Sequence, residues 1–470
     1  MTILESGVHI LIFPFPAQGH MIPLLDLTHH LATRGLTITI LVTPKNQSFL
    51  TSLLSLHPQI KTLVLPFPSH PSIPSHIENF KDLPPKSFNT FFRAFGNLHD
   101  PLLAWFKNHP SPPVAIVFDF FSGWTHRLAS QLGIKSIVFS PSGAMALSVM
   151  YSLWRHLPSH DDDRTAVVSF DEIPNCPKFQ WWQLSPLYRS YVKGDPTGEF
   201  IKDSFHGNME SWGLVINTFC ELERDYLNHL MKIMGHDRVW AVGPLLPSDH
   251  QDDQSGVVQR GGPSSVSVNH ILTWLDECDD HEVVYVCFGS QAVLRNDQME
   301  ELASGLQKSG VRFLWCLKEP REGLDDEGRY GVVPEGFEDR VAKRGLIIKG
   351  WVPQVMILNH RAVGAFLTHC GWNSTLEGLV AGVNMLTWPM GADQFVNSSL
   401  LVDELKVAER VCEGAETVPN SEELAQLVAE SVSEDGGRRK RVAALREAAL
   451  AAIKEGGSSV KNLDELVSYF

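Results

Sequence analysis

The sequence predicts an α/β protein made of two doubly wound, Rossmann-like domains. Short apolar runs with the length of buried parallel strands recur along both halves of the chain. Helical patterns separate them, beginning with the strand–helix–strand unit of residues 8–42. At 470 residues the chain is also too long for one compact core.

The expected strands are apolar runs that end at glycine, proline or polar residues. In the first half they are residues 8–13, 37–42, 60–65, 114–118, 136–139, 213–216 and 239–242. In the second half they are residues 283–288, 313–317, 346–348, 364–368 and 385–388. A helix is expected over residues 21–34. The resulting domains are residues 1–248 and 269–454, joined by a linker, residues 249–268, rich in Gly, Ser and Asp.

The composition is typical of a globular protein and argues against nucleic acid as its main partner. It is 43% hydrophobic and 20% charged, and its net charge of -15 disfavours nucleic acid and anionic membranes as partners. The apolar run 8–15 is too short to span a bilayer and contains Pro14. Seven scattered cysteines without a CxxC pair indicate reduced thiols, so we expect a cytoplasmic protein.

Residues 351–394 hold the densest group of polar motifs. A buried strand over residues 364–368 stops at a glycine-containing turn, and a helix is expected to begin at Asn373 as its N-cap. The free N–H groups and the dipole of such a helix end form an anion site that needs no metal. The next strand delivers Asp393 and Gln394 into the following loop, on the same edge of the sheet.

This stretch resembles the signature box of plant family 1 glycosyltransferases, which transfer sugar from a UDP-sugar to small molecules. The match runs through Trp351-Val352-Pro353-Gln354, His369-Cys370-Gly371-Trp372-Asn373-Ser374-Thr375, Glu377-Gly378 and Asp393-Gln394. The resemblance implies the GT-B fold, in which two such domains face each other across a cleft. It also implies a C-terminal helix, residues 455–470, that crosses back to the N-terminal domain.

Two residues of the first half are candidates for catalysis. His20 follows the first strand at a helix N-terminus, where the dipole disfavours its charged form and leaves a neutral general base. Alternatively, His20 has no special role and is simply one of the 20 histidines in the chain. Asp119 ends the strand 114–118 and would orient the imidazole, or would simply cap the next helix. The resemblance implies that the two form a catalytic dyad.

The resemblance assigns the donor contacts to the second half. Trp351 would stack on uracil while the backbone of Val352 reads its edge. Gln354 and Glu377 would hold the ribose, although Ser374 and Glu377 also fit a capping box. The diphosphate would meet His369, Asn373, Ser374 and Ser290.

The transferred sugar would lie among Trp372, Asp393 and Gln394, with Ser140 as a further contact. In the family, Gln at the last box position goes with glucose, whereas His goes with galactose and with some rhamnosyl enzymes. Other segments resemble the flavonol and dihydroxybenzoate glycosyltransferase subgroup, among them Gly19-His20-Met21-Ile22-Pro23 and Val42-Thr43-Pro44-Lys45-Asn46. Its flavonol 7-O-rhamnosyltransferase differs at the position of Gln394.

The expected function is inverting O-glycosyl transfer from UDP-glucose to a flavonoid or other small phenolic, by a monomer without cofactor or metal. The acidic run Asp161-Asp162-Asp163 formally contains a metal-binding DxD, but a solvated acidic loop is the better explanation. UDP-rhamnose and UDP-xylose remain alternative donors. A UDP-sugar-binding protein without turnover is the alternative outside the class. The absence of GxGxxG disfavours a nicotinamide-dependent oxidoreductase.

Overall fold

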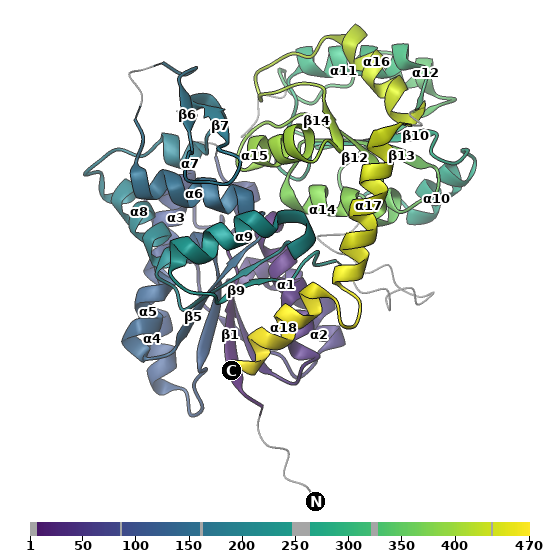
Figure 1. Cartoon of the computed structure of the whole chain (residues 1–470). Coiled ribbons are helices and arrows are strands. Elements are labelled where there is room, and N and C mark those ends of the chain that lie inside the picture. Colours follow the sequence, from purple (N-terminus) through teal and green to yellow (C-terminus); the bar gives the residue numbers. More distant parts are fainter. Residues whose placement is uncertain (1–6, 85–86, 160–162, 247–263, 321–327, 434–435) are drawn as a thin grey trace, which may run out of the picture. The chain divides into compact units, whose positions relative to one another are not determined.

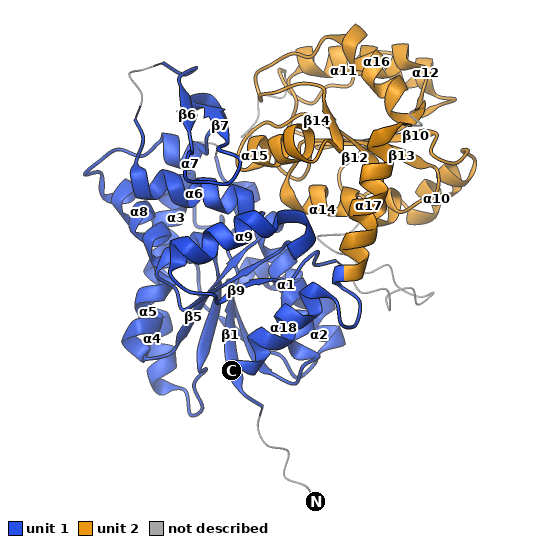
Figure 2. Cartoon of the chain, in the orientation of Figure 1, with its two compact units in different colours: residues 1–261, 452–470 blue, residues 262–451 orange. Residues whose placement is uncertain are grey.

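The computed structural model describes residues 7–84, 87–159, 163–246, 264–320, 328–433 and 436–470. The chain divides into two compact units, which Figure 2 colours separately. Unit 1 comprises Met1–Gly261 and Ala452–Phe470, and unit 2 comprises Gly262–Ala451. Most of the expected linker, residues 249–268, lies outside the described residues, as do Asp161 and Asp162.

Unit 1 is built on a seven-stranded sheet whose neighbouring strands are all parallel (Figure 1). In spatial order the strands are β3 (Lys61–Val64), β2 (Thr37–Val42), β1 (His9–Phe13), β4 (Ala115–Asp119), β5 (Lys135–Ser140), β8 (Gly213–Ile216) and β9 (Val239–Ala241). Every residue of β1 and β4 is buried, which explains why both strands are apolar except for His9 at the start of β1 and Asp119 at the end of β4. The strand order reverses between β1 and β4, so ligands are expected at the carboxyl ends of these two strands.

The helices of unit 1 connect these strands. They are α1 (Gln18–Ala32), α2 (Thr51–Leu56), α3 (Phe88–Phe95), α4 (His99–Asn108), α5 (Thr125–Leu132), α6 (Ala144–His156), α7 (Pro186–Arg189), α8 (Pro196–Met209), α9 (Cys220–Met234) and α18 (Ser458–Ser468). A separate antiparallel hairpin pairs β6 (Val167–Ser169) with β7 (Lys178–Gln180). The last helix, α18, buries Leu463 and Leu466 in the core of unit 1, and its Asn462 amide donates to the Ala241 carbonyl at 2.9 Å.

Unit 2 repeats the architecture with a six-stranded parallel sheet. In spatial order its strands are β12 (Gly345–Lys349), β11 (Arg312–Leu317), β10 (Val283–Cys287), β13 (Val363–Thr368), β14 (Asn384–Thr387) and β15 (Ala408–Arg410). Its helices are α10 (Val268–Asp276), α11 (Asn296–Ser309), α12 (Phe337–Val341), α13 (Gln354–Leu358), α14 (Trp372–Ala381), α15 (Gln394–Ser399), α16 (Ser421–Ser433) and α17 (Gly437–Ala452). The strand order reverses between β10 and β13, which defines a second switch point.

Each strand expected from the sequence is present, with both ends within one residue of the expected position. Strands β6, β7 and β15 were not predicted, because three-residue strands with exposed or charged positions carry no apolar run. The helix expected to begin at residue 21 begins at Gln18. No helix in the described part of the chain combines the length and apolar content that crossing a bilayer requires.

Candidate active site

His20 and Asp119 meet at the switch point of unit 1. His20 is in the first turn of α1, which follows β1, and Asp119 is the last residue of β4. The Nδ1 atom of His20 lies 2.9 Å from Oδ2 of Asp119. The Asp119 side chain is 0% exposed and that of His20 is 19% exposed. A carboxylate so deeply buried is stable only with hydrogen-bond donors around it.

Both oxygens of the Asp119 carboxylate accept a hydrogen bond. Oδ2 accepts from the His20 ring, and Oδ1 accepts from the backbone N–H of Phe121 at 2.9 Å. The second bond caps the 3-10 turn Phe120–Ser122 that follows β4. The two roles considered for Asp119 from sequence, orienting the imidazole and capping the next turn, are therefore served by different oxygens of the same group.

The contact with Asp119 determines which nitrogen of His20 carries the proton. An ionised carboxylate can only accept, so Nδ1 is the donor and Nε2 keeps its lone pair. Within the described ranges no hydrogen-bond partner approaches Nε2. An oriented imidazole with a free lone pair at a strand end has the form that a general base requires.

Aromatic rings surround His20. Its ring stacks on Phe121 at a centroid distance of 4.7 Å. Phe88 of α3 lies 5.5 Å from Phe121, and Phe80 lies 4.7 Å from Phe88. Phe80, Phe88 and Phe121 are only partly buried, and we call these three the aromatic wall. Sequence reasoning missed Phe80 and Phe88, although the phenylalanines of 88–95 recur at helical spacing.

In unit 2 the turn after β13 leads directly into α14. The N-cap is Gly371, so the prediction of Asn373 as N-cap is wrong by two residues. The turn is tighter than the sequence indicates because Cys370 adopts a left-handed conformation, with φ 63°. Asn373 and Ser374 therefore lie inside the first helical turn, where backbone N–H groups have no intrahelical acceptor.

The imidazole of His369 is held between two glycines. A Cβ atom on Gly289 or on Gly371 would come within 2.6 Å of its ring. The Nδ1 atom is buried without a hydrogen-bond partner in the described residues, and burial lowers the pKa of His369 to about 4. A buried, uncharged imidazole with an unsatisfied nitrogen is unusual, and Nδ1 remains available for a further hydrogen bond. Ser290 follows Gly289 and is partly buried.

Gln354 connects the residues predicted to hold the ribose. Its amide nitrogen donates to Glu377 Oε2 at 2.7 Å and to Ser374 Oγ at 3.0 Å, while its oxygen accepts from the Tyr285 hydroxyl at 3.3 Å. Ser374 is the third residue of α14 rather than its cap, and no side chain caps this helix. The alternative of a capping box formed by Ser374 and Glu377 is therefore wrong.

The segment before α13 turns sharply at Gly350, whose φ is 104°. The backbone of the next residue, Trp351, bonds in both directions to Ser265, since its N–H donates to Oγ and its carbonyl accepts from the Ser265 N–H, both at 2.7 Å. The Trp351 ring is partly exposed. In the described part of the chain the backbone of Val352 has no hydrogen-bond partner. A partly exposed indole beside an open backbone edge is compatible with nucleobase binding.

Gln394 is anchored at one end only. Its Oε1 accepts from the N–H groups of Met390 and Gly391, at 2.8 and 3.1 Å. Its amide nitrogen has no partner among the described residues and remains a donor. Asp393, the preceding residue, is the N-cap of α15 and is partly buried.

Two residues predicted to touch the sugar lie deeper than expected. Trp372 is 3% exposed. Ser140 is 0% exposed, and its hydroxyl donates to the carbonyl of Ser142 at 2.9 Å within its own turn. These positions favour structural roles, and sugar contacts by Trp372 and Ser140 stay predictions.

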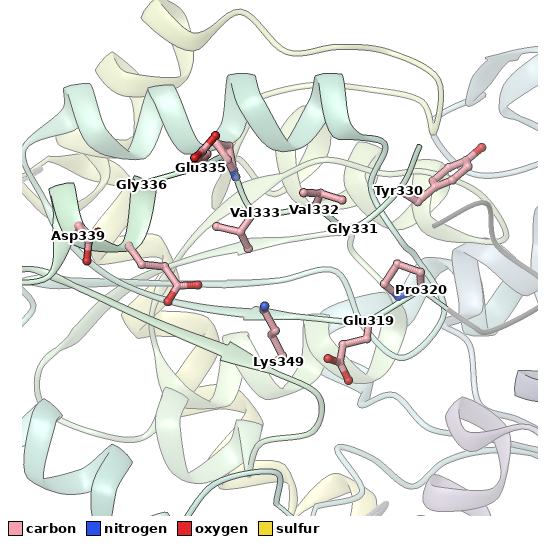
Figure 3. A pocket seen from close by; sticks show the side chains of 12 residues that line it. Glu319, Pro320, Tyr330, Gly331, Val332, Val333, Glu335, Gly336, Asp339 and Lys349 are labelled. Atoms are coloured by element: carbon pink, nitrogen blue, oxygen red, sulfur yellow. The ribbon is translucent and has the colours of Figure 1, made fainter. Parts of the chain in front are cut away.

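A separate hollow in unit 2, with a volume of about 750 Å³, contains none of the predicted donor residues (Figure 3). Glu319, Glu335, Glu338 and Asp339 outnumber Lys349 in its lining, so its charge would repel a diphosphate. Within the described ranges no group of three or more His, Cys, Asp or Glu side chains is arranged to hold a metal ion. That the protein needs no metal or cofactor stays a prediction.

Two parallel sheets, each with polar groups at its switch point, form the GT-B architecture of nucleotide-sugar-dependent transferases. A family model described as UDP-glucoronosyl and UDP-glucosyl transferase matches residues 255–412. The chain belongs to the UDP-glycosyltransferase family, within the flavonol subgroup of its plant members, and is a UDP-glycosyltransferase.

Relatives match along almost the whole chain. A flavonol 3-O-glucosyltransferase of Arabidopsis thaliana is 56% identical over 469 residues, which cover 99% of this chain and 96% of the relative. UDP-glycosyltransferase 89B2 of Stevia rebaudiana is 57% identical over 468 residues, covering 99% and 98%. The crystal structure of Arabidopsis thaliana UGT89C1 with UDP-L-rhamnose is 43% identical, covers 99% of both chains and has a TM-score of 0.82.

Substituting Gly371 tests the close approach of His369. We expect Gly371→Ala to weaken UDP binding by about tenfold or more, because the new methyl group displaces the imidazole beside the helix end. Isothermal titration calorimetry with UDP measures the effect. Gly391→Ala is the matched control, since no atom lies within 4 Å of its Cβ position. Equal UDP affinity in both variants would show that His369 does not contribute to the nucleotide site.

Proposed function

We propose that this UDP-glycosyltransferase transfers glucose from UDP-glucose to a hydroxyl of a flavonoid or another small phenolic, with inversion. The observation that carries the proposal is the 2.9 Å hydrogen bond between His20 and the buried Asp119, which leaves Nε2 of His20 free as a base. The protein acts as a cytoplasmic monomer and needs neither cofactor nor metal under this proposal.

His20 takes the proton from the acceptor hydroxyl at Nε2. The acceptor oxygen then attacks the anomeric carbon while UDP leaves from the opposite face, so an α-linked donor yields a β-glucoside. A phenol with a pKa of about 10 is within reach of an imidazole base when deprotonation accompanies attack. Asp119 stabilises the imidazolium that forms.

The leaving UDP gains negative charge as the glycosidic bond breaks. The first-turn N–H groups of α14 and the dipole of this helix stabilise that charge. His369 contributes a neutral imidazole, since its pKa of about 4 keeps it uncharged at neutral pH. Gln354 and Glu377, which are hydrogen-bonded to each other, hold the ribose, and Trp351 stacks on uracil.

Glucose is favoured by Gln394 and by the relatives. Gln394 keeps a free amide donor for a sugar hydroxyl, and the relative at 56% identity is a flavonol 3-O-glucosyltransferase. Rhamnose is the second candidate, because the relative crystallised with UDP-L-rhamnose is 43% identical. The aromatic wall beside His20 offers apolar ring faces and edges to a phenolic ring. A binding protein without turnover would not need the His20–Asp119 pair, which this chain retains.

The base is tested by His20→Ala. We expect the turnover rate to fall by about 10²–10⁴-fold, the usual contribution of a general base, while the Kd for UDP is unchanged. Glucoside formation from UDP-glucose and quercetin, followed by chromatography, measures the rate. His99→Ala removes another histidine of unit 1 paired with an aspartate, at 2.8 Å from Asp100, and should keep full activity. Normal turnover in His20→Ala would refute the proposed mechanism.

Asp119→Asn separates orientation from capping. The amide oxygen can still accept from Phe121, but the amide nitrogen donates to the imidazole and moves its proton to Nε2. We expect the thermal unfolding temperature to change little and turnover to fall by about 10³–10⁴-fold.

Donor choice is tested by competition among UDP-glucose, UDP-rhamnose and UDP-xylose for one flavonol, in the wild type and in Gln394→His. We expect glucose transfer to dominate in the wild type. The variant should lose about tenfold in kcat/KM for UDP-glucose, because one hydrogen-bond donor to the sugar moves. Preferred transfer of rhamnose by the wild type would make this protein a rhamnosyltransferase.

The aromatic wall is tested by Phe88→Ala. We expect the KM for quercetin to rise by about tenfold, because a partly exposed ring that packs against the acceptor is lost, while the KM for UDP-glucose is unchanged. Leu56→Ala removes an exposed apolar side chain elsewhere in unit 1 and serves as the control. A change in both KM values would indicate a general loss of structure.

A further inference from the structure

Two cysteines lie side by side at the carboxyl ends of neighbouring strands in unit 2. Cys287 of β10 and Cys316 of β11 are direct partners in the parallel register. Neighbouring strands are about 4.8 Å apart, and disulfides join Cα atoms separated by about 4.4–6.8 Å. The two thiols are close enough to shift each other's pKa. The pair therefore has the geometry from which a disulfide can form with little backbone movement.

The pair adjoins the predicted donor residues on both sides. Tyr285, whose hydroxyl donates to Gln354, precedes Cys287 by two residues on the same face of β10 and helps to lower its pKa. On the other side, the Cys316 thiol donates to the carbonyl of Gly350 at 3.2 Å, immediately before Trp351. Oxidation of the two sulfurs would therefore disturb the surroundings of Gln354, the predicted ribose contact, and of Trp351, which is predicted to stack on uracil.

The two thiols differ in reactivity. The neighbouring thiol of Cys316 lowers the pKa of Cys287, whereas the thiol of Cys287 and burial raise the pKa of Cys316. Cys287 is partly buried and Cys316 is buried. A thiolate is the nucleophile in disulfide exchange, so Cys287 reacts first and Cys316 resolves.

We propose that Cys287 and Cys316 form a redox-sensitive dithiol whose oxidation to a disulfide weakens nucleotide binding at the adjoining donor site. This inference rests on the proposed function of that site. Disulfides in a reducing compartment are transient and regulatory rather than structural, which suits a pair placed beside a ligand site instead of between distant segments.

A low-molecular-weight disulfide such as oxidised glutathione is the oxidant. The Cys287 thiolate attacks one of its sulfur atoms, the S–S bond breaks, and one glutathione thiolate leaves with the electron pair. Cys316 then loses its proton and attacks the Cys287 sulfur of the mixed disulfide, releasing the second glutathione. Two protein thiols are oxidised, one small disulfide is reduced to two thiols, and the two protons are carried by the released glutathione molecules.

The test uses full-length protein with Cys176→Ser as the background, because Cys176 is exposed and would react independently. Reduced protein is treated with oxidised glutathione, and its UDP affinity is measured by calorimetry. Peptide mapping identifies the linked cysteines. We expect a Cys287–Cys316 link, a UDP Kd higher by about tenfold or more, and full recovery with dithiothreitol.

Cys287→Ser and Cys316→Ser should bind UDP in the reduced state and show no response to the oxidant. Thermal unfolding verifies that both variants fold. If a variant is unstable, peptide mapping of the parent protein, which carries only Cys176→Ser, still shows whether Cys287 and Cys316 become linked. A parent protein in which the two residues stay unlinked overturns the proposal, and so does a linked protein with unchanged UDP affinity. Reduced parent protein that fails to bind UDP or to transfer sugar would instead refute the proposed function.

Discussion

The buried carboxylate of Asp119 is the constraint on which the first half of the site depends. A carboxylate with no exposed surface costs several kcal/mol unless donors surround it. The protein supplies two, one from the backbone after β4 and one from the ring that follows β1. Because these strands are neighbours only through the reversal of strand order, the topology itself brings the acid and the imidazole together.

Unit 2 uses the same topological position for different chemistry. Among the residues that the structure describes, this switch point pairs no buried histidine with a carboxylate, since His369 Nδ1 has no partner and Glu377 bonds to Gln354. Instead, glycines 289 and 371 let backbone and imidazole approach closely, and a helix end supplies partial positive charge. These groups bind and stabilise an anion without taking or giving a proton, which is what a leaving diphosphate requires. The chemistry of each unit therefore follows from the side chains that its sequence places at equivalent strand ends.

Local sequence signals predicted the strands of both sheets, because residues buried on two faces must be apolar whatever their partners are. Features that depend on distant neighbours could not be predicted. The early start of α14 depends on the left-handed Cys370, the aromatic wall depends on the packing of α3 beside the turn after β4, and the thiol pair depends on the register of β10 and β11. The family resemblance assigned roles to residues, but it did not indicate these contacts.

The structure also shows why capping and catalysis were not true alternatives for Asp119. A carboxylate has two oxygens that accept in different directions, so the bond that ends β4 also fixes the plane in which the second oxygen meets His20. A residue bonded only to the imidazole could rotate about its own side chain and lose alignment. The cap removes that freedom, and a group that looks structural thereby positions the base. Gln354 shows the same principle in unit 2, because bonds at both ends of its amide fix the orientation in which it meets Glu377.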